Sequence, residues 1–479
     1  MKLYNTPERK VVDFEPIEKG HVKIYTCGPT VYSYQHIGNY TAYIYWDILV
    51  RTLELHDYRV RRVLNMTDVG HLVSDEDEGE DKMEKGARLS EKTVWEVAEY
   101  YSADFLKNFR KLGLLEPTVI ARATDYIEEN LEMVATLKEK GFAYQIDDGI
   151  YFDTSKFARY ADFAKLDLEN LRAGARVEFN EMKRNVTDFA LWKFVRPGEK
   201  HDMQWETPVE LLDGDEVIMG YPGWAIECSA IIKKELGDTI DIHTGGIDHI
   251  PVHHTNEIAQ SESANGVKFS NYWLHCDFIT VDGQKISKSL GNIYTLDDLN
   301  RKKFSHEDFK MWVLQGHYQS ERNFSFENLE AAKNRLRSWK NAAALRHQIN
   351  DTVVRDTDKN SELMTVPRMI TGALSDNLNT PLALAMIDGV FTKLESSNLE
   401  NVSKKSLVGF LEFVERALGV DLIETTPDID EDLKRKILAR ERARTEKNFK
   451  EADRLREEIE AEGIVLRDAL NRTLWEYGS

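Results

Sequence analysis

One short stretch, residues 25–39 (YTCGPTVYSYQHIGN), limits what this chain can fold into more than any other part of the sequence. Residues 22–26, which enter it, are mostly apolar and predict a buried strand. Gly28-Pro29 then imposes a sharp turn, because glycine permits unusual φ values and proline fixes φ. Apolar side chains at helical spacing follow between residues 42 and 53. This order predicts a parallel α/β sheet with a ligand at the carboxyl end of the strand, where a helix N-terminus also favours phosphate.

The length and composition of the chain set outer limits. At about 150 residues per domain, 479 residues suggest about three domains, and 42% hydrophobic residues are enough for their cores. No window approaches the about 18 apolar residues of a membrane span, and the N-terminal MKLYNTPERK lacks the apolar core of a secretory signal. The cysteines Cys27, Cys228 and Cys276 do not make a disulfide framework and suit a reducing cytosol. We therefore expect a cytoplasmic protein that does not contact a membrane.

The charge distribution excludes one class of function. The net charge of −20 argues against a nonspecific nucleic-acid coat, although a structured RNA partner that reads local patches stays compatible with it. Residues 431–479 carry 12 Lys and Arg and 12 Asp and Glu, so the acidic excess lies upstream of them. The C-terminal tail is therefore the region that repels phosphate least.

The pattern of apolar residues predicts two α/β halves separated by an insertion and followed by helices. The expected elements are strands at 59–64 and 150–152, amphipathic helices at 95–109 and 123–140, and a polar insertion at 166–184. A charge run at 75–85 predicts a solvated loop, and residues 220–258 are dense in polar, site-type side chains. Helix is expected from 295 to 318 and from 327 to 423, a linker at 425–427, one long charged helix at 438–462 and a short strand at 464–466.

Two short motifs suggest phosphate chemistry. The first is His36-Ile37-Gly38-Asn39 at the predicted strand-to-helix turn. The second is Lys285-Ile286-Ser287-Lys288-Ser289, whose two lysines and two hydroxyls suit a flexible loop that grips phosphate. Each motif alone is equally compatible with an ordinary capped helix or a solvated turn. Together they resemble the HIGH and KMSKS signatures of class I aminoacyl-tRNA synthetases, written here as HIGN and KISKS.

A third group of residues has the chemistry of a metal site. His253 and Glu257 are four residues apart and share a face if they lie on a helix. Cys27 follows the first strand and Cys228 lies in the second half of the predicted sheet, so the four side chains can meet at a switch point. All are acceptable zinc ligands. On spacing alone, the cysteines are also compatible with ordinary core thiols, and His254 is as good a candidate as His253.

Longer matches make the resemblance specific. The segments CGPTVYSYQHIGN, GWAIECSAI, HTGGIDHIPVHHTNEIAQSE, KISKS, NLNTP and EADRLREEIEAEGIVLRD occur in the order found in the cysteinyl-tRNA synthetase family, and the resemblance covers essentially the entire chain. Two departures are visible. Val69-Gly70-His71 replaces a run that usually holds two acidic residues and a lysine, and HTGGID has two glycines where the family has three.

The resemblance implies an activity. It implies ATP-dependent activation of L-cysteine to cysteinyl-adenylate, with Mg²⁺, and transfer of the cysteine to the 3′ end of tRNA(Cys) by a monomeric enzyme. One zinc ion, held by Cys27, Cys228, His253 and Glu257, would select the substrate thiol. A site built on one strong specific contact can reject an analogue by roughly 10⁴ without editing.

The resemblance also implies roles for single residues. His36 and Asn39 would contact the ATP phosphates and ribose, and Lys285 and Lys288 would neutralise the departing pyrophosphate. The other implied positions are Thr67 and Trp224 in the amino-acid pocket, Gly245, Gly246 and Asp248 against adenosine, and Arg444, Asp453, Arg456 and Asp468, with Phe449 as a stacking candidate, at the anticodon. The ordinary alternatives are a helix cap for Thr67, a core aromatic for Trp224 and a solvated face for the charged C-terminal helix.

The implied fold class is α/β, with a Rossmann-like doubly wound parallel-sheet catalytic domain, an insertion, an α-helical bundle and a small C-terminal anticodon-binding module. The expected segments are the first half of the catalytic domain at 1–120, the connective insertion at 121–215, the second half with KISKS at 216–300, the stem-contact and helical-bundle domain at 301–425 and the anticodon module at 426–479.

Two other functions fit parts of the pattern. One is a related ligase that joins cysteine to a sugar amine; it shares the catalytic core but lacks the complete anticodon module, so the IVLRD end argues against it. The other is a zinc-bearing RNA-binding protein without catalysis, against which the intact KISKS motif argues.

Overall fold

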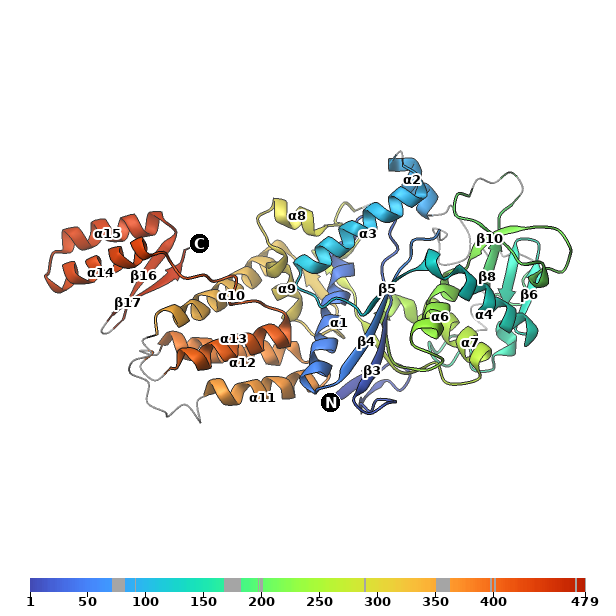
Figure 1. The fold of residues 1–479 in the computed structure, drawn as a ribbon, viewed down its shortest axis with the longest axis horizontal. Helices are drawn as coiled ribbons and strands as arrows, with labels where there is room; N and C mark the ends of the chain where they lie inside the picture. The colour runs from blue at the N-terminus through green and yellow to red at the C-terminus, as the bar shows by residue number, and fades with distance from the viewer. Residues whose placement is uncertain are drawn as a thin grey trace. The chain divides into compact units, whose positions relative to one another are not determined.

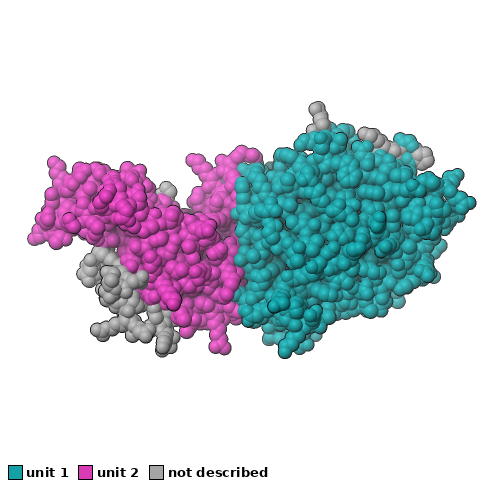
Figure 2. Space-filling model, viewed as in Figure 1, with its two compact units in different colours: residues 1–299, 318–323 teal, residues 300–317, 324–479 magenta. Residues whose placement is uncertain are grey.

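The computed structural model describes residues 1–70, 82–90, 92–167, 182–196, 198, 201–287, 290–349, 362–396, 399, 402–469 and 472–478. The chain divides into two compact units, residues 1–299 with 318–323 and residues 300–317 with 324–479 (Figure 2). Most of the predicted charged loop and of the predicted polar insertion lies outside the described residues; the end of the charged loop enters helix α2 (Lys82–Ser90). Among the described residues, no helix combines the length and the apolar composition that crossing a membrane requires.

Unit 1 is organised around the predicted doubly wound parallel sheet. Its strand order is β12-β11-β3-β4-β5, and every neighbouring pair is parallel. The strands are β3 (His21–Thr26), β4 (Arg59–Met66), β5 (Val119–Arg122), β11 (Ile240–Gly246) and β12 (Ser270–Cys276). After β3, the strands β4 and β5 are added on one side of it, and β11 and β12 are then added on its other side. The switch point therefore lies between β3 and β11, where a doubly wound sheet binds ligands.

The helices of unit 1 include α1 (Ile37–Leu55), α3 (Val94–Lys111), α4 (Ile127–Glu139), α6 (Trp224–Glu235) and α7 (Thr255–Asn265). Helix α1 is buried along most of its length, as its apolar and aromatic sequence predicts. Asp47 fixes α1 to the following chain, because its carboxylate accepts hydrogen bonds from the Arg51 side chain at 2.6 Å and from the Leu115 backbone at 2.7 Å. Asp47 therefore ties the middle of α1 to the chain that leads into β5.

The insertion forms a second sheet with the order β6-β7-β8-β10-β9, in which every neighbouring pair is antiparallel. Its strands are β6 (Ala143–Ile146), β7 (Gly149–Phe152), β8 (Phe189–Phe194), β9 (Trp205–Glu206) and β10 (Met219–Pro222). Strand β10 was expected at the start of the second catalytic half but pairs with β8 and β9 in this sheet. The close approach depends on Gly223, where a Cβ atom would lie 2.0 Å from the carbonyl oxygen of Ala190.

Smaller elements complete this part of the chain. Strands β1 (Lys2–Asn5) and β2 (Lys10–Asp13) form an N-terminal hairpin. Strands β13 (Ile279–Val281), β14 (Gln284–Lys285) and β15 (Arg322–Phe324) form a three-stranded sheet in the order β14-β13-β15. Helix α8 (Leu296–Arg301) follows the KISKS segment.

Unit 2 is helical, as predicted, from α9 (His306–Leu314) through α10 (Phe326–Ala344), α11 (Glu362–Ser375), α12 (Thr380–Ser396) and α13 (Lys404–Leu418). The prediction of one long charged helix after it was wrong. The chain forms two helices, α14 (Glu431–Thr445) and α15 (Phe449–Ala461), which lie side by side (Figure 1). The chain turns because Lys447 adopts the left-handed conformation (φ 59°) and the Asn448 side chain accepts a hydrogen bond from the Glu451 backbone.

The predicted short strand near the C-terminus is the first strand of a hairpin. Strand β16 (Ile464–Ala469) pairs antiparallel with β17 (Arg472–Tyr477), which the sequence did not indicate. Their apolar side chains, including Ile464, Leu466 and Trp475, pack with Leu433, Ile437 and Ile459 of the two helices. The C-terminal tail therefore has its own small core.

Candidate active site

The four side chains predicted to bind a metal lie together at the switch point of the parallel sheet. Cys27 directly follows β3, and its backbone N–H donates to the carbonyl of Thr244 on β11 at 3.1 Å. Cys228 lies on α6, His253 in the π-helical turn Ile250–His254, and Glu257 in the first turn of α7. One ligand atom from each of the four side chains lies within 4.8 Å of the others, and all four are buried. Metal binding by this cluster stays a prediction.

The cluster concentrates charge in a buried place. His243 Nε2 lies 2.8 Å from Oε2 of Glu257, and His253 Nε2 lies 2.9 Å from Oε1 of the same carboxylate. Burial raises the pKa of Glu257, but these two histidines outweigh it and hold the pKa at about 2. Burial lowers the pKa of His253, but Glu257 and Cys228 outweigh it and raise the pKa to about 10. Burial raises the pKa of the Cys228 thiol as well, but hydrogen bonds from Cys27 and His253 bring it below its ordinary value.

The donor atoms of the cluster fit a metal ion. Oε1 of Glu257 is buried and has no hydrogen-bond partner among the described residues. Oε1 lies 2.9 Å from His253 Nε2 without the alignment of a hydrogen bond. Burying such charge is costly unless another charge compensates it. Two thiols, an imidazole and a carboxylate make a set that suits zinc.

A second set of four residues shares two of these ligands. Cys27, His243, His254 and Glu257 also place one ligand atom each within 4.8 Å of the others. In this set both histidines already have hydrogen-bonding partners, since His243 reaches Glu257 at 2.8 Å and His254 reaches Cys27 at 3.4 Å. The set also has only one thiol. Each histidine of the His253-His254 pair therefore belongs to one of the two sets, and metal binding through His253 stays a prediction.

A buried chain of hydrogen bonds leads from the N-terminal hairpin to Cys27. Thr6 Oγ1 lies 2.6 Å from His275 Nδ1, His275 Nε2 lies 2.7 Å from His254 Nδ1, and His254 Nε2 lies 3.4 Å from Cys27 Sγ. Burial lowers the pKa of both histidines, so each is neutral and has one donor and one acceptor. If Cys27 is a thiolate, its sulfur can only accept. Every hydrogen bond of the series then donates toward the sulfur, from the Thr6 hydroxyl through His275 and His254.

Thr67 and Trp224 lie at the edges of this cluster. Thr67 donates to Glu227 at 3.1 Å and accepts from the Asn65 side chain at 3.0 Å, and its backbone pairs with the loop after Cys27. The described residues thus give Thr67 a role in holding the loop and no helix to cap. The Trp224 ring is half-buried and packs on His253 with ring centroids 4.5 Å apart. Gly28 is required here, since a Cβ atom would lie 1.6 Å from the Asn65 carbonyl oxygen.

The HIGN motif caps α1 and also presents a donor. His36 Nδ1 accepts from the Gly38 N–H at 3.1 Å, and the Asn39 side chain accepts from the His36 N–H at 3.0 Å. Burial lowers the pKa of His36 to about 4. His36 is therefore neutral at pH 7, and because Nδ1 accepts, Nε2 carries the proton. The ordinary capping interpretation and the phosphate-binding one are compatible.

The two signature motifs lie next to each other in unit 1. The Ile37 N–H donates to the Tyr294 carbonyl at 2.9 Å, and a Cβ atom on Gly38 would lie 3.3 Å from Ile286 Cδ1. Lys285 ends β14 and is exposed. The Asn292 side chain bridges the loop, accepting from the Ser287 N–H at 2.8 Å and donating to the Lys285 carbonyl at 3.0 Å. Lys288 and Ser289 lie outside the described residues.

The predicted adenosine contacts lie at the carboxyl end of β11. A Cβ atom on Gly245 would lie 2.6 Å from His254 Cε1, and one on Gly246 would lie 2.2 Å from Asp248 Oδ1. Asp248 itself is exposed. Gly245 is therefore needed for the packing of this corner, whether or not adenosine lies against it, whereas the exposed Asp248 side chain could move away from a side chain at position 246.

Comparison with known proteins decides the family. The family described as "tRNA synthetases class I (C) catalytic domain" matches residues 13–334, and the one described as "Cysteinyl-tRNA ligase anticodon binding domain" matches residues 426–475. The "Cysteine--tRNA ligase" of Treponema denticola is 39% identical to this chain, over 99% of each chain. The "Cysteine--tRNA ligase 1" of Burkholderia lata is 42% identical, over 98% of this chain and 95% of its own. This chain belongs to the cysteine–tRNA ligase family.

The fold agrees with this membership. A Mycobacterium tuberculosis methionyl-tRNA synthetase in complex with methionyl-adenylate superposes with a TM-score of 0.56, covering 85% of this chain and 91% of its own, at 15% identity. At this identity the likeness concerns the fold alone. The predicted family, the predicted α/β fold class and the helical C-terminal region of a cysteine–tRNA ligase are thereby confirmed.

The anticodon residues expected for a cysteine–tRNA ligase have different surroundings. Asp468 is paired with Arg444 and with the buried Arg440, the latter at 2.8 Å. Arg456 pairs with Glu460 at 2.8 Å along its own helix. Asp453 is exposed and makes no hydrogen bond or ion pair with the residues that the structure describes, and the Phe449 side chain is 61% exposed. Asp453 and Phe449 are therefore the most available of the predicted contacts.

Several residues of the site were not predicted. Asn65 and Glu227 contact Thr67, and His243 contacts Glu257. His275 contacts His254, the alternative ligand, and Thr6 contacts His275. The sequence signal for His243 is its place in the HTGGID segment, and Glu227 directly precedes Cys228. Thr6 and His275 are 269 residues apart, and no local pattern indicates that they meet.

Proposed function

We propose that this protein activates L-cysteine with ATP and transfers the cysteinyl group to the 3′ end of tRNA(Cys). The observation that carries the proposal is the buried cluster of two thiols, an imidazole and a carboxylate at the switch point of the sheet. In this class of fold the switch point is where the ligand binds. Membership of the cysteine–tRNA ligase family supports the same activity.

We assign the metal to Cys27, Cys228, His253 and Glu257. His243, which donates to the second oxygen of Glu257, and the Thr6–His275–His254 chain, which ends at Cys27, would orient these ligands from behind. Zinc, when bound there, favours a thiolate over a hydroxyl and so would separate cysteine from serine, which differs by one atom. Trp224, packed on His253, would cover one side of the amino-acid pocket, and Thr67 would hold the loop that forms another.

The signature residues would bind ATP, which enters with Mg²⁺. The proton on His36 Nε2 is available to a phosphate oxygen, and the N-terminus of α1 favours an anion. Asn39 would contact the ribose, and Gly245, Gly246 and Asp248 would lie against adenosine. Lys285 and Lys288 would offset the negative charge that develops on pyrophosphate.

Two transfers complete the reaction. The cysteine carboxylate attacks the α-phosphorus, the bond to the bridging oxygen breaks, and pyrophosphate leaves. The terminal hydroxyl of the tRNA then attacks the carbonyl of the adenylate, and AMP leaves. No side chain of the protein has to act as a nucleophile. Arg444, Asp453, Arg456 and Asp468 would contribute to tRNA recognition in the C-terminal module. We infer a cytoplasmic protein because all three cysteines are free. That it is a monomer is implied only by the family resemblance.

The experiment that tests the proposal has two stages. Cysteine-dependent exchange of pyrophosphate into ATP should occur and should be at least 10³-fold weaker with serine. Purified tRNA(Cys) should then accept cysteine. Exchange without charging would point to the ligase that joins cysteine to a sugar amine, and absence of both activities would contradict the proposal.

A further inference from the structure

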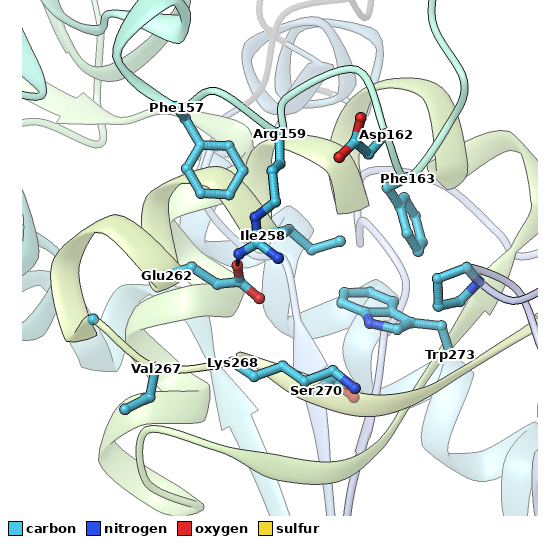
Figure 3. A pocket seen from close by; sticks show the side chains of 12 residues that line it. Phe157, Arg159, Asp162, Phe163, Ile258, Glu262, Val267, Lys268, Ser270 and Trp273 are labelled. Carbon is cyan, nitrogen blue, oxygen red and sulfur yellow. Dashed lines mark hydrogen bonds and ion pairs between the residues drawn. The ribbon is translucent and has the colours of Figure 1, made fainter.

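A pocket of about 460 Å³ lies in unit 1 beside the residues described above and has no part in the proposed reaction. It lies between the loop after β7 and the segment that leads into β12, with α7 behind it (Figure 3). Its volume falls in the range of small-molecule sites, about 300–1,000 Å³. The lining residues include Asp162, Phe163, Ile258, Glu262, Lys268 and Trp273.

One end of the pocket is aromatic. The rings of Phe163 and Trp273 lie 5.0 Å apart at a tilt of 58°, and both side chains are buried. Figure 3 shows them together on one side of the pocket, with Ile258 beside them. Flat apolar walls of this kind suit an aromatic or large apolar side chain, because such rings gain from offset or edge contacts as well as from burial.

The polar groups of the pocket divide into a paired set and an unpaired set. Arg159 and Glu262 form an ion pair at 2.6 Å, and the other oxygen of Glu262 accepts from the Phe269 N–H at 3.2 Å. Asp162 and Lys268 have no ion-pair partner among the described residues; the Lys268 ammonium reaches only the Asn271 carbonyl, at 3.5 Å. Figure 3 shows Asp162 and Lys268 on opposite sides of the pocket.

We propose that this pocket binds a free α-amino acid with an aromatic side chain. The carboxylate of the amino acid would meet Lys268, its ammonium would meet Asp162, and its ring would pack against Phe163 and Trp273. The pocket offers one positive and one negative group that form no ion pair with the described residues, so a zwitterion matches it better than an aromatic acid or an aromatic amine alone.

The pocket has two direct connections to the metal cluster. Ile258 lines the pocket and follows Glu257 on α7. Trp273 lines the pocket and stacks on His243 with ring centroids 4.4 Å apart and planes within 14°, and His243 donates to Glu257 at 2.8 Å. An amino acid that repositions Ile258 or Trp273 would therefore shift Glu257, so the site is a regulatory one for cysteine binding.

The binding test uses the full-length, metal-loaded protein and three matched probes. L-phenylalanine should give a saturation-transfer NMR signal and a measurable affinity. 3-Phenylpropionate, which lacks the ammonium, and 2-phenylethylamine, which lacks the carboxylate, should each bind at least fivefold more weakly. Saturating cysteine should not displace L-phenylalanine, because the catalytic pocket is a different site.

Variants of exposed residues locate the binding. Lys268→Ala and Asp162→Ala should each weaken L-phenylalanine at least fivefold, whereas Lys268→Arg should retain most of the affinity. Lys19→Ala, which changes an exposed lysine away from the pocket, is the matched control. Absence of binding, displacement by cysteine, or equal binding of all three probes irrespective of the substitutions would each overturn the proposal.

The effect of this pocket on cysteine binding is measured separately, through the apparent KM for cysteine, and this test rests on the proposed function. L-phenylalanine should change the apparent KM for cysteine in pyrophosphate exchange at least twofold in the wild type and leave it unchanged in the Asp162→Ala, Lys268→Ala double variant. An unchanged KM despite binding would overturn the coupling. Loss of exchange altogether would instead count against the proposed function, while the NMR measurement would still decide the binding site.

Discussion

At the scale of single residues, the proposed metal site should depend on side chains that are not among its proposed ligands. Thr6→Val keeps the shape of the side chain but removes the hydroxyl, which leaves the buried Nδ1 of His275 without its partner at 2.6 Å. Loss of such supporting hydrogen bonds typically costs 10–100-fold in metal affinity, so we expect zinc to bind about tenfold more weakly. Competition with a chromophoric chelator measures this affinity. Thr6→Ser should behave like the wild type, and an unchanged affinity in Thr6→Val would remove Thr6 from the site.

A second residue-scale prediction concerns acid stability. Burial lowers the pKa of His36 to about 4, below its ordinary value of about 6.5. Between these values the unfolded chain binds a proton that the folded chain does not, so His36 destabilises the fold as pH falls from 6.5 to 4 and has no such effect above 6.5. His36→Asn, which keeps a capping acceptor, should therefore lose less stability over this range in denaturant unfolding. If the free energy of unfolding falls equally with pH in the variant and the wild type, His36 does not have the lowered pKa.

How much of the site could be predicted is clearest at this scale. The four ligand candidates followed from residue chemistry, from the spacing of His253 and Glu257, and from the family resemblance. The supporting residues could not be predicted, because their contacts depend on strand register. His243 lies beside Tyr25 on the neighbouring strand, and His275 lies beside Gly245. A shift of one residue in either pairing would turn these imidazoles to the other face of the sheet.

At the scale of elements, the corner between α14 and α15 shows where periodicity fails. The charged sequence from 438 to 462 keeps a helical pattern through the corner, so the pattern predicts one helix. The chain turns because Lys447 adopts a positive φ and Asn448 caps the next helix, and both are single-residue effects. By contrast, β3, β4 and α1 were predicted correctly, because the apolar residues that mark them in the sequence are the ones that the structure buries.

This explanation predicts the effect of changing the corner. Asn448→Ala removes the cap and should destabilise α15 by about 1 kcal/mol, which is about a fivefold loss of hydrogen-exchange protection in Phe449–Ala461. Lys447→Gly should have the opposite effect, since glycine adopts the left-handed conformation without strain. If Asn448→Ala leaves the exchange of α15 unchanged, the side chain does not define the corner.

At the scale of the whole molecule, the metal cluster and the C-terminal module belong to different compact units. Asp453→Ala should therefore lower tRNA charging at least fivefold and leave cysteine-dependent pyrophosphate exchange unchanged. Glu431→Ala, a change of another exposed acid in the same module, is the control and should affect neither activity. A parallel fall in exchange and charging would show that Asp453 contributes to stability and not to tRNA recognition.

The sequence predicts the order of these parts better than their exact limits. The domain boundaries stay predictions, but the structure shows why they are hard to infer from the chain. Residues 318–323 return to unit 1 after the chain has entered unit 2, and β10 joins the insertion sheet immediately before α6 returns to the parallel sheet. Both crossings involve a few residues whose composition does not differ from that of their neighbours.

The central claim is that this protein selects cysteine through a metal held by Cys27, Cys228, His253 and Glu257. The most direct measurement is the absorption spectrum of the cobalt-substituted protein. We expect one metal ion per chain in the wild type and loss of most of the metal in Cys228→Ser. Adding cysteine should strengthen the thiolate-to-cobalt charge-transfer band, because the substrate thiol adds to the two thiols of the protein. Serine at the same concentration should leave the band unchanged. A spectrum that does not respond to cysteine would mean that the metal is structural, and would contradict the claim.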